Sequence, residues 1–325
     1  MDKIPVFGTI GRTVGFAFSR YLSLLGIVWL PFVVSCAAIY FFFDPFISSI
    51  RQVVQRAQHH LPPTVDPFPP EFLRWMGLLD ILLLLVYAMI RVGVAKEALG
   101  LRKGPRFVYF WMGAAEFRVI GAYFILLALV YVSIIAILLA SAILGAIVYA
   151  AATGAIEQHA MPQETLGWLT QAAVAFGLIV ALVWCYFAVR LSYFVVPVTV
   201  AERRFGILRS WELTRGNFWR IVAISIVIVI AYFVVEIIAM LFVFGPVIAH
   251  FGMSAAQLPA TGPERFALLE KSIAGYAIYG VAIATLFVPI FYGLLLAPSA
   301  FAYRALVPAV PEGSAAPMMK EGSYP

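Results

Sequence analysis

The sequence predicts an all-α membrane protein with six transmembrane helices, and three observations lead to this fold class. Hydrophobic residues make up 63% of the chain and charged residues 12%, whereas a soluble domain averages about 45–50% and about 25%. The apolar residues gather in six runs, each long enough to cross a hydrocarbon core of about 30 Å. Lysine and arginine concentrate in alternate connections between the runs, as the positive-inside rule requires of a multi-pass protein. The expected spans are 22–43, 76–95, 119–152, 169–198, 221–248 and 273–303.

A short amphipathic segment precedes the first span. Between residues 2 and 20, Val6, Ile10, Val14 and Phe18 recur at every fourth position, which places them on one face of a helix. Such a helix is typical of one that lies in the headgroup region. The alternative is an ordinary flank of the first span.

The connections between the spans differ in composition. Residues 44–71 are rich in proline, which forbids a continuous helix and predicts a stiffened loop, although Ile47–Gln58 by itself suits a short helix. A second amphipathic approach carries Phe107, Phe110, Trp111, Ala114 and Phe117 on one face and ends at Arg118. We therefore expect a membrane domain over residues 1–307 and a flexible tail over residues 308–325, where apolar residues are too few to form a core.

The orientation follows from the distribution of positive charge. With the N-terminus inside, the inner segments hold 17 lysine and arginine residues and the outer loops hold 5. This asymmetry predicts that both termini are cytoplasmic, in a multi-pass protein of the bacterial inner membrane. The same rule accounts for the net charge of +6, so no nucleic-acid partner is expected.

A weak internal repeat divides the chain into three units. Arg20, Arg118 and Arg220 each close an approach segment and open a span, at separations of 98 and 102 residues. Tyr87 with Arg91 matches Tyr186 with Arg190 in the returning spans. The pattern favours three hairpins, each preceded by an amphipathic interfacial helix, over the alternative that six similar spans produce such spacing by chance. Arg91 and Arg190 are expected to extend toward the lipid phosphates.

The segment before the fifth span carries the densest group of basic and aromatic residues. These side chains are candidates to contact anionic lipid headgroups or a protein partner, since each basic group near such a surface contributes about 1 kcal/mol. The alternative is generic anchoring by an aromatic belt. The candidate residues are Arg203, Arg204, Arg209, Trp211, Arg215, Trp219 and Arg220.

Two acidic residues fall inside the predicted spans. Asp80 lies in the outer half of the second span, and Glu236 follows Arg220 by 16 residues in the fifth, which is about 24 Å along a helix. Ionisable groups inside a membrane are costly and often mark a transport pathway. The alternative places Asp80 near the interface and Glu236 in a protonated or hydrogen-bonded state within the bundle.

One stretch resembles a known family. Arg209-Ser-Trp-Glu-Leu-Thr-Arg-Gly-Asn-Phe-Trp-Arg220, which runs directly into an apolar span, resembles the signature of a broad group of bacterial polytopic membrane proteins. That group includes the membrane domain that precedes the catalytic barrel in some glycerophosphodiester phosphodiesterases. The resemblance implies membrane placement and a lipid-related role. The chain contains no counterpart of the barrel, so phosphodiesterase activity is not implied.

No catalytic, cofactor-binding or metal-binding motif stands out in the sequence. Phosphate-binding glycine loops, serine nucleophile elbows and paired metal-ligand spacings do not occur. We therefore expect a protein that is not an enzyme and uses no cofactor, with a lipid-related or partner-organising role whose partners are membrane lipids or another protein. The alternative is a secondary transporter or channel with a polar pathway through Glu236 and Asp80.

Overall fold

The computed structural model describes residues 3–58, 70–102, 107–109, 112–156, 163–254 and 262–307, and within these residues it contains helices but no strand. The predicted all-α fold class is confirmed. The expected tail at 308–325 lies outside the described residues. The helices are α1 (Val6–Ser19), α2 (Tyr21–Gln58), α3 (Pro70–Ala98), α4 (Ala114–Ile156), α5 (Gln163–Ser192), α6 (Val195–Glu202), α7 (Ile207–Thr214), α8 (Phe218–Ser254) and α9 (Gly262–Leu306).

Six helical segments are long and apolar enough to cross a membrane. Each overlaps one of the predicted spans, so the chain is a multi-pass membrane protein as expected. The segments are Tyr21–Phe42, Arg74–Ala98, Ala114–Ala142, Ala175–Glu202, Phe218–Val243 and Ile278–Leu306.

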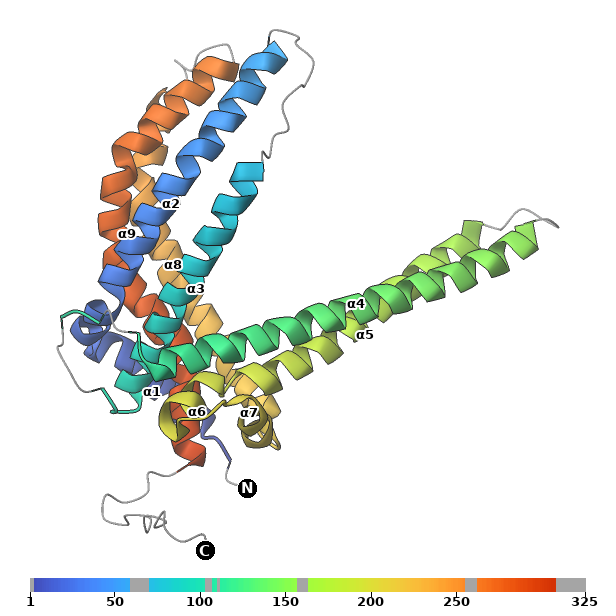
Figure 1. Cartoon of the computed structure of the whole chain (residues 1–325), viewed down its shortest axis with the longest axis horizontal. Coiled ribbons are helices and arrows are strands. Elements are labelled where there is room, and N and C mark those ends of the chain that lie inside the picture. The colour runs from blue at the N-terminus through green and yellow to red at the C-terminus, as the bar shows by residue number, and fades with distance from the viewer. Residues whose placement is uncertain are drawn as a thin grey trace, which may run out of the picture.

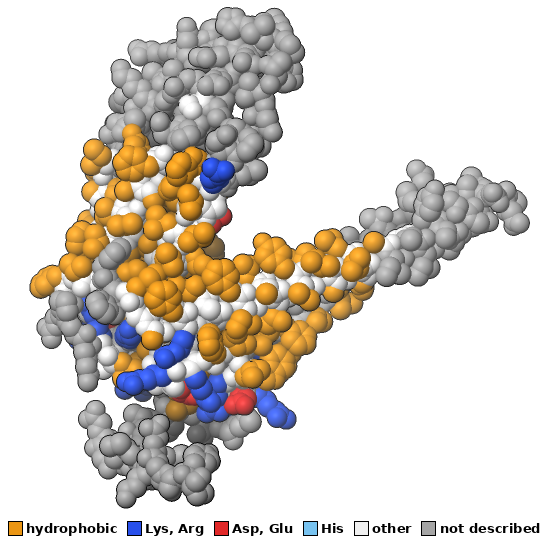
Figure 2. Space-filling view, viewed as in Figure 1, with side chains coloured by type: hydrophobic (Ala, Val, Ile, Leu, Met, Phe, Trp, Pro, Cys, Tyr) orange, Lys and Arg blue, Asp and Glu red, His pale blue; other side chains and the backbone are white. Residues whose placement is uncertain are grey.

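The helices form two limbs that diverge from a common base (Figure 1). One limb is a bundle in which α2 packs against α3 and α9, and α8 packs against α9. The other limb is the hairpin of α4 and α5, which runs away from the bundle. Helices α1, α6 and α7 and both ends of the described chain lie at the base (Figure 1). Lysine and arginine side chains gather on the same side (Figure 2), which we call the basic end.

The best-packed core lies at the base rather than along the limbs. Leu24, Ile221 and Leu294 are fully or almost fully buried there, and Ile4 joins them from the segment before α1. Half of the residues in the most apolar stretch of α3 are buried, whereas no residue in the corresponding stretch of α4 is buried. Hydrophobic side chains accordingly cover most of the described surface of both limbs in Figure 2, as lipid-facing helices require.

The amphipathic helix predicted before the first span is α1, but its apolar stripe has a different partner. Val6, Ile10 and Val14 pack against the protein core, where α1 meets α8 and α9. Phe18, the last residue of the predicted stripe, is exposed, as is Phe7. The stripe was expected at the headgroups because the sequence alone gives no sign of a protein surface on which it can be buried.

Two connections differ from the prediction. Helix α2 continues to Gln58, so the expected loop at 44–71 begins later than Asp44; residues 59–69 of it lie outside the described part. The middle approach is not helical at 107–109 or 112–113, whereas the third approach contains α7. A separate amphipathic approach helix is thus present before the first and fifth spans, whereas the described part of the approach to the third becomes helical only where α4 begins at Ala114.

The fourth span is interrupted near the basic end. Helix α5 ends at Ser192 and α6 begins at Val195. Pro197 falls in the first turn of α6, where a residue without an N–H group is tolerated; deeper in a continuous helix it would remove a backbone bond. The hydroxyl of Ser210 accepts a hydrogen bond of 3.0 Å from the N–H of Phe194, which satisfies the backbone at the break.

Candidate functional site

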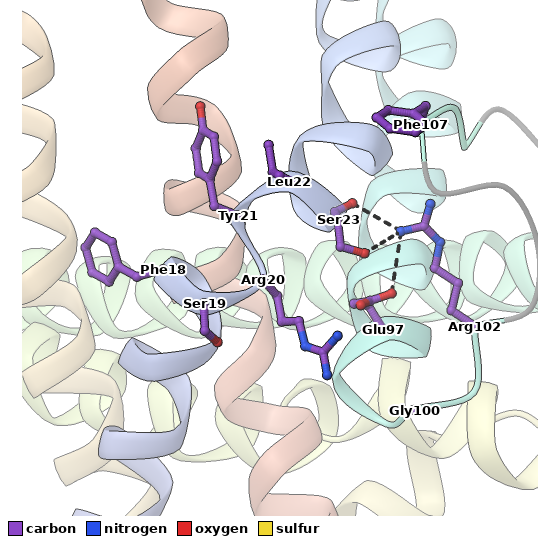
Figure 3. Close-up of a pocket in the computed structure, with 10 residues that line it drawn as sticks. All are labelled: Phe18, Ser19, Arg20, Tyr21, Leu22, Ser23, Glu97, Gly100, Arg102 and Phe107. Carbon is purple, nitrogen blue, oxygen red and sulfur yellow. Dashed lines mark hydrogen bonds and ion pairs between the residues drawn. The ribbon is translucent and has the colours of Figure 1, made fainter.

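A pocket of about 690 Å³ opens at the basic end between the α1–α2 junction and the end of α3 (Figure 3). Its lining combines guanidinium groups, a carboxylate and hydroxyls with large apolar side chains. The lining residues are Phe18, Ser19, Arg20, Tyr21, Leu22, Ser23, Glu97, Gly100, Arg102 and Phe107.

Two sharp turns build this pocket. Helix α1 ends at Ser19 and α2 begins at Tyr21, so Arg20 alone separates them. After α3, Gly100 adopts a φ of +71°, a left-handed conformation that glycine enters without steric cost. The N–H of Leu101 then donates to the carbonyl of Lys96 at 2.8 Å, as in a Schellman cap. This turn brings Arg102 back against the start of α2.

Arg102 joins the two walls of the pocket. Its Nη1 donates to the carbonyl oxygen of Ser23 at 3.1 Å and to the Oγ of Ser23 at 3.0 Å, and it lies 3.5 Å from Oε2 of Glu97. These contacts are drawn as dashed lines in Figure 3. The side chains of Arg102 and Glu97 are only 6% and 13% exposed, so this pair is a stable part of the pocket wall.

Arg20 is different, because its guanidinium is exposed and has no hydrogen bond or ion pair with any described residue. It extends from the α1–α2 junction beside the end of α3 (Figure 3). Phe18, Leu22 and Phe107 form an apolar rim and are 56%, 72% and 79% exposed. A free cation beside exposed apolar side chains suits a ligand that has both an anionic group and a hydrocarbon part.

The basic and aromatic residues predicted from the third approach divide into two groups. Trp219 is 78% exposed, and the exposed side chains of Arg203 and Arg215 form no hydrogen bond or ion pair with the described residues. These three remain available for a headgroup or partner. The other four, Arg204, Arg209, Trp211 and Arg220, contact the protein itself.

Three of those four are arginines held by backbone or carboxylate oxygens. Arg220 donates to the carbonyl of Ile4 at 2.9 Å, beside Asn217, whose Oδ1 accepts the N–H of Ile4 at 3.1 Å. Arg204 pairs with Glu202. Arg209 hydrogen-bonds to a carboxylate oxygen of Glu212 at 2.8 Å, and this bond raises the pKa of the arginine above its usual value. Much of the predicted binding surface therefore stabilises the base.

Trp211 belongs to a clamp around Arg190. The guanidinium carbon lies 3.6 Å from the centroid of the Trp211 ring, and Nη2 donates to the Trp211 carbonyl at 3.0 Å. Nε donates to Oγ1 of Thr214 at 3.3 Å. Arg190 is 8% exposed, so the expectation that it reaches the lipid phosphates is wrong. Helix α7 covers it, and sequence position alone does not place α7 there.

Comparisons with known proteins do not assign the chain to a family. Neither models of protein families nor curated proteins nor solved structures match the chain. Any function therefore has to be argued from the geometry of this chain.

The two acidic residues predicted inside the spans have different surroundings. Asp80 is exposed on α3 and lines a cavity of about 470 Å³ with Ser35, Tyr87 and Tyr292. Glu236 is partly buried on α8 and has no hydrogen bond or ion pair with a described residue. Asp80 therefore lies beside a defined cavity.

Sequence reasoning missed the pocket and a buried ion pair beside it. Glu116 is fully buried and pairs with Nζ of Lys96 at 2.9 Å, while the hydroxyl of Tyr109 donates to it at 2.7 Å. Burial and this hydrogen bond raise the pKa of the Tyr109 phenol above its ordinary value. No motif in the sequence predicts these contacts, because they depend on how the chain folds back at Tyr109. No cluster of three or more metal-ligand side chains occurs among the described residues.

Proposed function

We propose that this chain is a non-enzymatic protein of the bacterial cytoplasmic membrane that binds phospholipid headgroups at its basic end and thereby organises lipid or a protein partner. The observation that carries this proposal is Arg20, an exposed guanidinium without a described partner, in a pocket rimmed by exposed apolar side chains. A phospholipid fits both features, since its phosphate pairs with Arg20 while its acyl chains lie against Phe18 and Leu22.

Two further features of the chain support a lipid ligand. The exposed cations Arg203 and Arg215 and the exposed ring of Trp219 lie on the third approach, a combination common at a membrane interface. The resemblance of the Arg209–Arg220 stretch to lipid-related membrane domains points in the same direction. The proposal places both termini in the cytoplasm because both ends of the described chain lie at the basic end; reporter fusions at each terminus test this, and a periplasmic signal from either would contradict it.

Titration with phosphatidylglycerol tests the headgroup site. The full chain, delipidated in a neutral maltoside detergent, is titrated and the bound lipid counted by native mass spectrometry. Arg20→Gln should weaken binding about fivefold, the equivalent of about 1 kcal/mol for one basic group near an anionic headgroup.

Arg12→Gln is the matched control, because Arg12 is an exposed arginine of α1 that does not line the pocket. It should leave the affinity nearly unchanged. Equal weakening by both variants would mean that general surface charge, rather than the pocket, attracts the lipid.

A second candidate function is transport along a polar pathway that includes Asp80 and Glu236. It is favoured by the cavity that Asp80 lines with two tyrosines. In a background without Cys36 and Cys185, cysteines introduced at positions 80 and 236 should react with a membrane-impermeant thiol reagent if they line such a pathway. Protection of both positions from both sides of the membrane would eliminate this function.

A further inference from the structure

Arg91 is a cation inside a membrane-spanning segment, and no carboxylate among the described residues pairs with it. It lies in the span Arg74–Ala98, where an unpaired charge is costly. Its Nη1 donates to the hydroxyl of Tyr123, and its Nη2 donates to the hydroxyl of Tyr87 at 2.5 Å. No ion pair joins it to any described residue. The tyrosines orient the guanidinium but leave its charge uncompensated.

A cavity of about 170 Å³ lies against this arginine. It is bordered by α3, the α5–α6 turn and α9, where the two limbs meet, and its lining includes Arg91, Ser192, Tyr193 and Ser299. Two hydrogen-bond donors around it are unused: Nε of Arg91 and the hydroxyl of Tyr193 are buried and have no partner. A buried donor without an acceptor is destabilising, so the cavity lacks an acceptor rather than a donor.

Arg190 provides a comparison, because its Nε has a protein partner whereas the Nε of Arg91 has none. Like Arg91, it follows a tyrosine by four residues and donates to that hydroxyl, here Tyr186 at 2.7 Å. Its Nε is satisfied by Thr214 of α7. The middle approach, where described, has no helix corresponding to α7. The Nε of Arg91 has no partner, and this chain leaves a cavity beside it.

The volume of the cavity and its depth in the membrane indicate which chemical group it can hold. A water molecule accounts for about 30 Å³ of liquid volume, so the cavity admits a group of about five heavy atoms, the size of a phosphate. Arg91 precedes the end of α3 at Ala98 by seven residues, about 10 Å along the helix. That depth is within reach of a headgroup phosphate of the neighbouring leaflet and of an oxyanion from the adjoining solution.

We infer that Arg91 and Tyr193 form an intramembrane binding site for a phosphate-type oxyanion at the junction of the two limbs. The oxyanion supplies both the negative charge that balances Arg91 and the acceptors for its Nε–H and for the Tyr193 hydroxyl. The site is separate from the headgroup pocket, since the lining residues of the two have no member in common. Occupancy would tie α3 and α9 to the α5–α6 turn and so fix the base of the α4–α5 limb.

The test measures the thermal unfolding midpoint of the full chain in a neutral maltoside detergent. In one arm, inorganic phosphate replaces chloride at constant ionic strength. In the other arm, phosphatidylglycerol is added to protein that carries Arg20→Gln, which removes the contribution of the headgroup pocket. A rise in the midpoint with phosphate that Tyr193→Phe reduces identifies a free oxyanion as the ligand, because the general stabilisation by phosphate salts does not depend on this hydroxyl. A rise with the lipid alone that the same variant reduces identifies a headgroup.

Three variants decide whether the signal comes from this site. Tyr193→Phe removes one unused donor without breaking an existing bond, so it should fold and should weaken binding about fivefold. Arg91→Gln should weaken binding at least about tenfold, because it removes a charged donor. Tyr279→Phe removes a phenol of α9 that bonds to the Phe242 carbonyl and should leave the affinity unchanged.

The inference fails if Tyr193→Phe binds both probes as tightly as the parent protein. It also fails if neither phosphate nor phosphatidylglycerol raises the midpoint of the parent protein above that in chloride. Should Arg91→Gln not fold, Tyr193→Phe still decides the outcome.

Discussion

Glu116 illustrates how one buried charge organises a connection between spans. Its side chain is fully buried. It accepts hydrogen bonds from Lys96, from the Tyr109 hydroxyl and, at 3.0 Å, from the N–H of Gly113. These bonds hold Tyr109 and Gly113 against the end of α3. A buried carboxylate is tolerated when its partners satisfy it in this way.

Replacing this acid should destabilise the protein. Glu116→Gln removes the charge opposite Lys96, whose side chain is 24% exposed, so we expect a loss of about 2 kcal/mol in the free energy of unfolding. Chemical unfolding in detergent measures it. Glu212→Gln is the control, because that side chain is 62% exposed and its loss should change stability by less than about 0.5 kcal/mol. Equal effects would contradict a special role for Glu116.

Tyr109 should make stability depend on alkaline pH. Burial raises the pKa of its phenol above the ordinary value of 10.0, so the folded state keeps the proton that the unfolded chain loses. The contribution of the phenol is complete below pH 10 and is lost as pH rises above it. The stability difference between the parent protein and Tyr109→Phe should therefore narrow above pH 10. A difference that stays constant from pH 8 to pH 11.5 would contradict this assignment.

At the level of elements, the α6–α7 connection depends on one close backbone approach. A Cβ on Gly206 would lie 2.6 Å from the carbonyl oxygen of Val195 and 3.1 Å from the Cβ of Val198. Arg203, three residues earlier, turns the chain with a φ of +55°. Helix α7 therefore reaches Arg190 because the chain can pass close to α6 at a residue without a side chain.

Gly206→Ala should displace α7 and loosen the clamp on Arg190. We expect a loss of about 2 kcal/mol or more in the free energy of unfolding, since backbone atoms must move to admit the methyl group. Gly11→Ala is the control: Gly11 lies in α1 with nothing near its added Cβ, so alanine should stabilise the helix by up to about 1 kcal/mol. Thermal unfolding compares them, and similar midpoints for the two variants would refute the close approach.

At the level of the whole molecule, side chains in the base and side chains on the limbs have different surroundings. Leu294 in the base is 1% exposed, whereas Leu138 on the α4–α5 limb is 63% exposed. Truncation of Leu294 would leave a cavity that the surrounding protein cannot fill, whereas lipid tails can occupy the space left by truncation of Leu138. The base is therefore the part of the molecule on which folding depends most.

Matched truncations test this difference between base and limb. Leu294→Ala should lower the free energy of unfolding by about 2–5 kcal/mol, as core leucine truncations do. Leu138→Ala should lower it by less than about 1 kcal/mol, because lipid or detergent fills the gap. Unfolding of both variants under the same detergent conditions provides the comparison. An equally large loss at Leu138 would mean that the limb is buried against another protein surface.

The spans, the helical fold class and the amphipathic helices at 6–19 and 207–214 are visible in the sequence, because each depends on the hydropathy and spacing of neighbouring residues. Only the tertiary structure decided which arginine side chains are available to bind a ligand. Arg20 is exposed, Arg190 is clamped by α7, and Arg91 borders a cavity. These three differ because their surroundings come from distant segments, and turns such as that at Gly100 determine which segments meet. Local hydropathy sets whether a helix enters the membrane, whereas the partner of a charge depends on how the helices pack.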